Sequence, residues 1–122
     1  MSHEFQNVLA GDDTRSRVAR VLKCLIKMRS MSDPDAMQTA AICNEIRVSP
    51  PTLKKLLNGD IGKVEHLVAL TQYLSVKNHE VFLIAESYTT TQDLTYLVTS
   101  LMQKHSTVTG ELRVAYDQRH LA

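Results

Sequence analysis

Two short helical patterns separated by a tight break, within residues 37–76, constrain this chain more than any other feature of its sequence. Apolar residues at helical spacing predict one helix from about Ala36 to Ile46 and a second that ends near Asn58. Gly59 follows directly, and glycine is the commonest residue just beyond a helix end. Residues 47–50 form the predicted turn between the two helices. This segment is therefore expected to have a helix-turn-helix arrangement.

Helical patterns also cover most of the remaining chain. Further helices are predicted at about Thr14–Met31, Lys63–Leu74, His79–Ser87 and Thr91–Lys104. Within them, Val64 is expected to face inward, and the nearly continuous apolar run 81–85 is expected to be deeply buried. Asn78 is placed to cap the helix that follows it. The predicted fold class is all-α.

The helix predicted over residues 91–104 carries one apolar stripe. Its members recur at i, i+3, i+4, i+7 and i+8, and they are Leu94, Leu97, Val98, Leu101 and Met102. The stripe could close over the core of its own chain, or it could pair with the same stripe in a second copy. A compact five-helix domain already accounts for residues 14–87, so we favour dimerisation.

Length and composition limit the organisation of the chain. Its 122 residues suit one domain, here predicted as a flexible N-terminus (1–13), a helical domain (14–87) and a C-terminal helical extension (88–122). No apolar run is long enough for a transmembrane helix, and the N-terminus does not resemble a signal peptide. Cys24 and Cys43 both fall in apolar helical patterns and are expected to be small buried thiols. A cytoplasmic protein without membrane association is expected.

Charge is distributed unevenly along the chain. The net charge is only +1, but residues 15–55 hold nine lysines and arginines against three acidic residues. A surface that binds phosphate groups would have this composition, and so would an ordinary solvated helix face. Charge alone does not decide between the two.

The spacing of residues around the break resembles the lambda-repressor-like (XRE/Cro-type) family of DNA-binding domains. The matching positions are Gln38–Thr39, Ile42–Cys43, Ile46–Ser49, Leu53, Leu56 and Gly59. The resemblance covers about residues 14–87. It implies a five-helix DNA-binding domain, here with an additional C-terminal helix. It also implies that the helix at about Pro51–Asn58 enters the major groove of double-stranded DNA.

Two positions depart from the family pattern. Arg47 stands where the family usually has a glycine with positive φ, so the turn is expected to take another shape. Pro50 and Pro51 occupy positions where family members often place side chains that bind base edges. Proline offers no such hydrogen bond, although it can pack on a thymine methyl group. The doublet also suggests that the helix begins one residue later than in the family.

The resemblance assigns a set of DNA-binding candidates around the break. They are Gln38, Thr39, Arg47, Ser49, Pro50, Pro51, Thr52, Lys54, Lys55 and Asn58. Ser49 and Asn58 fit phosphate contacts, but they would look the same as helix caps alone. Arg17, Arg20 and Lys27 in the first helix are weaker phosphate candidates.

No catalytic constellation is evident, and no cofactor or metal is expected. The five histidines are scattered, and neither a metal-binding spacing nor a glycine-rich phosphate loop is present. The favoured hypothesis is a sequence-specific transcriptional regulator, a dimeric repressor acting on a (pseudo)palindromic operator. The alternative is a protein-interaction module, such as an antitoxin, anti-regulator or adaptor, that keeps the fold without specific DNA binding. A nucleoid-type protein without sequence preference is a third hypothesis.

Overall fold

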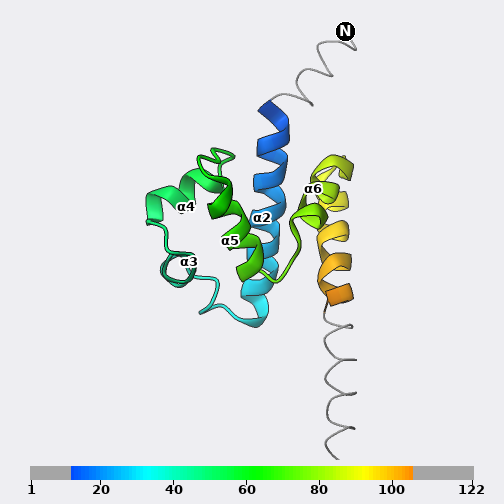
Figure 1. Cartoon of the computed structure of the whole chain (residues 1–122). Helices are drawn as coiled ribbons and strands as arrows, with labels where there is room; N and C mark the ends of the chain where they lie inside the picture. Colours follow the sequence, from blue (N-terminus) through cyan, green and yellow to red (C-terminus); the bar gives the residue numbers. More distant parts are fainter. Residues whose placement is uncertain (1–11, 106–122) are drawn as a thin grey trace, which may run out of the picture.

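The computed structural model of the chain describes residues 12–105, and within that range its regular secondary structure is entirely helical. The all-α prediction is thus confirmed for this part of the chain. The helices are α2 (Asp12–Ser32), α3 (Thr39–Ile46), α4 (Pro50–Leu56), α5 (Val64–Tyr73), α6 (Asn78–Ser87) and a helix over residues 91–105, drawn unlabelled in yellow to orange in Figure 1. None of these helices is both long enough and apolar enough to cross a membrane. The predictions for residues 1–11 and 106–122 lie outside the described residues.

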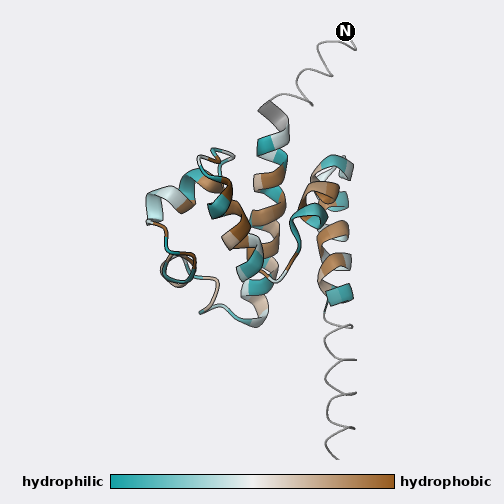
Figure 2. Ribbon diagram, in the orientation of Figure 1, coloured by the Kyte–Doolittle hydropathy of each residue, from teal (hydrophilic) through white to brown (hydrophobic). Residues whose placement is uncertain are grey.

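The long helix α2 is the centre of the fold. Figure 1 shows α3, α4 and α5 on one side of it and α6 with helix 91–105 on the other. Its inward face carries Val18, Val21, Leu22 and Leu25, all essentially inaccessible to solvent. In Figure 2 the middle of α2 is accordingly mostly apolar. α2 begins at Asp12, two residues before the predicted start at about Thr14.

Helix 91–105 packs against the core of its own chain. Leu94, Val98 and Leu101 are buried there, and Leu97 and Met102 are partly buried against the same apolar cluster. The predicted use of this stripe as a dimer surface is therefore wrong for its three buried members. The physical reason is that the other helices leave part of the core uncovered, and this helix covers it.

Two predictions of burial fail because they ignored helical geometry. Val64 is 66% exposed, because it is the first residue of α5 and precedes the stripe that reaches the core. Within the run 81–85, Val81, Ile84 and Ala85 are buried, but Phe82 and Leu83 are 39% and 62% exposed. Successive residues on an α-helix are about 100° apart, so five in a row cannot all face one core.

The start of α3 also differs from the prediction. Residues 34–37 form turns, and the helix begins at Thr39 rather than near Ala36. The Tyr73 hydroxyl donates a hydrogen bond of 2.6 Å to the Ala36 carbonyl, which ties this turn to the end of α5. The turn therefore has a tertiary partner that local sequence patterns do not reveal.

Arg17 joins α2 to the end of α6. Its guanidinium donates to the carbonyl oxygens of Ala85, at 2.6 Å, and Tyr88, and it lies 3.9 Å from the centre of the Tyr88 ring. Ala85 belongs to the last turn of α6, whose backbone acceptors have no partner within the helix, and Tyr88 is the residue that follows the helix. Arg17 therefore has a structural role, unlike the phosphate contact suggested from sequence.

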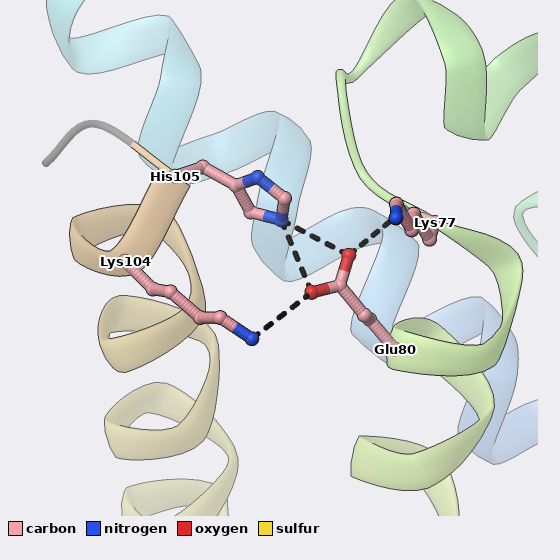
Figure 3. Close-up of polar contacts among 4 residues, drawn as sticks. All are labelled: Lys77, Glu80, Lys104 and His105. Atoms are coloured by element: carbon pink, nitrogen blue, oxygen red, sulfur yellow. Dashed lines mark hydrogen bonds and ion pairs between the residues drawn. The ribbon is translucent and has the colours of Figure 1, made fainter. Parts of the chain in front are cut away.

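Glu80 joins α6 to the end of helix 91–105 (Figure 3). Its carboxylate accepts a 2.9 Å hydrogen bond from the Lys77 backbone N–H, lies 3.0 and 3.2 Å from His105 Nε2, and is 3.9 Å from Lys104 Nζ. Partial burial acts to raise the pKa of Glu80, but the hydrogen bonds and the charges of His105 and Lys104 outweigh it and lower that pKa. Glu80 thus caps α6 and fixes the last described turn. Asn78, the predicted cap, instead accepts a hydrogen bond from Thr71.

Candidate nucleic-acid interface

The turn between α3 and α4 has the left-handed conformation that the sequence seemed to disfavour. Arg47 has φ 58° and ψ 52°, and the Val48 N–H donates to the Cys43 carbonyl at 3.1 Å. The prediction of another turn shape is therefore wrong. The side chain of Arg47 is exposed while Val48 packs partly against the core, so the turn is held by its neighbours despite the unfavourable φ.

Ser49 starts α4 as an N-cap. Its hydroxyl accepts a 3.3 Å hydrogen bond from the Thr52 N–H and lies 2.8 Å from the Thr52 hydroxyl. α4 begins at Pro50, one residue earlier than predicted. Both prolines fit because the first N–H groups of a helix have no intrahelical acceptor, so the helix loses no hydrogen bond there.

Two leucines hold α4 against the core and leave its other side in solvent. Leu53 and Leu56 are each 2% exposed, and Leu57 is partly buried beside them. Lys54 and Lys55 are exposed, and none of the ion pairs among the side chains of residues 14–105 involves either lysine. α4 therefore presents two ammonium groups to solvent on a helix anchored from behind.

Gly59 fixes the far end of α4 against α2. It has φ +93°, and a Cβ atom at this position would lie 3.3 Å from both the Arg15 carbonyl carbon and the Ser16 backbone nitrogen. The Asp60 N–H also donates to the Lys55 carbonyl at 2.9 Å. The glycine is thus needed for its conformation and for the close approach of two backbones.

The predicted DNA-binding residues lie on one continuous segment, α3–turn–α4. Gln38 is the N-cap residue of α3 with its side chain exposed, and Thr39 follows it at the surface. Of the ten candidates, only Thr52 is half-buried; the others are exposed. The ten candidates are Gln38, Thr39, Arg47, Ser49, Pro50, Pro51, Thr52, Lys54, Lys55 and Asn58.

The segment is basic but not uniformly so. Arg47, Lys54 and Lys55 are exposed cations, while Glu45 and Asp60 are exposed acids at the ends of α3 and just beyond α4. Positive charge is therefore concentrated on α4 and its preceding turn, which is the part that projects from the domain in Figure 1.

Sequence reasoning missed one basic residue near this segment. The close approach at Gly59 brings Arg15, which is exposed, next to the end of α4. The two positions are 44 residues apart, and the only sequence signal was a glycine that had been interpreted as a helix end alone.

Other chemistry has little support within residues 12–105. No three His, Cys, Asp or Glu side chains there come together as a group that could hold a metal ion. Both cysteines are free, and burial raises the pKa of the Cys24 thiol, with nearby Lys27 opposing the shift in part. A thiol with a raised pKa is a weak nucleophile at neutral pH.

Comparison with known proteins gives no relative: no family model, curated protein or solved structure matches the chain.

Proposed function

We propose that this chain is a sequence-specific DNA-binding regulator with a lambda-repressor-like helix-turn-helix domain. The observation that carries the proposal is α4, which is anchored by Leu53 and Leu56 and exposes Lys54 and Lys55. A short helix held from behind, with cations on its free side, is suited to enter the major groove. A regulator of this kind, most simply a repressor that blocks a promoter, acts in the cytoplasm.

The geometry at the start of α4 assigns roles within this proposal. The hydroxyls of Ser49 and Thr52 are 2.8 Å apart and bond to each other. They are therefore partly occupied before any DNA arrives. Lys54 and Lys55 are the side chains left to reach guanine acceptors or phosphates, and Pro50 and Pro51 can pack on a thymine methyl group.

The proposal includes a homodimer, because one such domain contacts few base pairs and a second copy doubles the contact set. The apolar stripe of helix 91–105 is largely used within the chain. Three large apolar side chains remain exposed on the side of α2 away from α4: Phe82, Leu83 and Tyr96. Sedimentation of the Leu83→Asp and Tyr96→Asp variants tests this location. A wild-type dimer that neither substitution weakens would show that the interface lies elsewhere.

Selection of bound fragments from random double-stranded DNA tests the function itself. A regulator enriches one sequence, with two half-sites if it binds as a dimer. Lys54→Ala and Lys55→Ala are then expected to weaken binding to that sequence by roughly 1–3 kcal/mol each, if each lysine reads a base. A lysine whose removal leaves affinity unchanged is not a reader.

A second candidate is a protein-interaction module such as an antitoxin, anti-regulator or adaptor. The exposed Pro50–Pro51 doublet favours it, because these two positions offer apolar surface and no hydrogen-bonding side chain. This candidate predicts no enrichment from random DNA and no mobility shift with mixed fragments at low salt. Equal affinity for all fragments would instead indicate a nucleoid-type protein.

A further inference from the structure

We propose that Arg15, in α2, is a phosphate-contact residue of the DNA-binding surface, held beside the end of α4 by Gly59. The inference rests on the proposed function and adds a residue to that same site. It starts from the contact at Gly59, where a Cβ atom would lie 3.3 Å from the backbone of Arg15 and Ser16. Because no side chain separates them, the first turns of α2 and the end of α4 form one surface.

The direction of Arg15 follows from its neighbour Arg17. Arg17 reaches toward α6, where it binds the carbonyls of Ala85 and Tyr88. Two residues along an α-helix correspond to a rotation of about 200°, so Arg15 is directed to nearly the opposite side of α2. The opposite side is the one on which α3, α4 and α5 lie (Figure 1).

The chemistry of the position suits a phosphodiester. Arg15 is exposed, and it takes part in none of the ion pairs among the side chains of residues 14–105. A guanidinium can donate two parallel hydrogen bonds to one phosphate. Lys55, in the last turn of α4, adds a second cation near the same end. Asp60 follows Gly59 and opposes these charges, so the expected contribution is that of one contact rather than a strong site.

The test compares Arg15→Gln with Lys23→Gln. Both residues are exposed on α2, both variants lose one positive charge, and the two positions are eight residues, or about 12 Å, apart. Dissociation constants are measured for the selected operator and for an unrelated duplex of equal length, each at several salt concentrations. Because the loss of net charge is the same, Lys23→Gln is the control for long-range electrostatics.

The expected result is a uniform loss. Arg15→Gln should weaken binding to both duplexes by the same factor, roughly five- to tenfold, and should lower the slope of log affinity against log salt by about 0.9. Lys23→Gln should leave the slope unchanged. Arg15→Lys, which keeps the charge, should restore most of the slope.

Other results would overturn the inference in distinguishable ways. If the wild-type chain binds no duplex, the proposed function fails and the inference fails with it. If DNA binds and the Gln variants at positions 15 and 23 behave alike, only the assignment of Arg15 fails. A loss confined to the operator would make Arg15 a base-reading residue, and an unfolded Arg15→Gln chain in circular dichroism would make it structural.

Discussion

The two sides of α2 use their polar groups differently. On the side of α6 and helix 91–105, charged side chains form contacts within the fold. Arg17 binds backbone carbonyls at the end of α6, and Glu80 binds the Lys77 backbone N–H and the side chains of His105 and Lys104. On the side of α3 and α4, apolar side chains anchor the two helices, among them Ile42 and Leu53, and the cations remain in solvent. One side uses its charges for contacts within the fold, and the other leaves them exposed.

Two of the positive φ angles among the described residues lie next to α4. The exposed turn before α4 holds Arg47 at φ 58°, and the contact beside α2 depends on Gly59 at φ +93°, while Ser75, at φ 59°, follows α5. A non-glycine residue with positive φ costs about 1 kcal/mol and persists where the surrounding structure fixes it. The turn before α4 thus has a defined geometry at a small loss of stability.

The largest effect is expected in helix 91–105, where it tests whether the apolar stripe packs in the core or forms a dimer interface. Val98 is fully buried, so Val98→Asp places an unpaired carboxylate in the apolar core and should cost about 4 kcal/mol or more. Urea denaturation followed by circular dichroism measures this loss. Ser100→Asp, exposed on the same helix, should change stability by less than about 0.5 kcal/mol. A Val98→Asp chain that stays fully stable and merely becomes monomeric would return the stripe to the dimer interface.

The next effect concerns Glu80 and pH. Because the folded chain lowers the pKa of Glu80, its carboxylate stabilises the fold above the unfolded pKa of about 4.3 and loses that contribution as pH falls through the folded value. Glu80→Gln should therefore destabilise the chain by about 1 kcal/mol at pH 7. The difference from wild type should shrink below pH 4.5. A difference that stays constant down to pH 3 would mean that the charge of Glu80 has no part in it.

An effect of similar size is expected at Gly59, and Gly62 supplies the control. Gly59→Ala combines a positive φ with a contact of 3.3 Å to backbone atoms, so it should cost about 1–2 kcal/mol. It should also weaken DNA binding, because α4 and α2 must move apart. A Cβ atom at Gly62 meets nothing within 4 Å, so Gly62→Ala should change neither property. If the two variants have the same unfolding temperature, Gly59 does not position α4 against α2.

These contrasts mark how much could be predicted from the sequence. Helical periodicity located the helices and the inward leucines of α4, because those signals are local and repeat along the chain. It did not predict the contacts of Arg17 with Ala85, of Glu80 with His105 or of Tyr73 with Ala36, since each joins residues at least 25 positions apart. It also misjudged Phe82 and Leu83, where an apolar run was taken as burial without regard to the direction of each side chain.

The smallest effect is expected at Arg47, where one substitution should raise stability and lower DNA affinity. Arg47→Gly removes the cost of a left-handed arginine and should stabilise the chain by up to about 1 kcal/mol. Ser75, at φ 59° after α5, is the matched position away from α4, so Ser75→Gly should give a similar gain. Only Arg47→Gly should weaken DNA binding, because only Arg47 adds a cation to the segment around α4. Thermal unfolding and DNA affinity measured on both variants would decide the matter. If both variants gain stability and bind DNA as well as wild type, the turn contributes its shape to the surface and the charge of Arg47 contributes nothing.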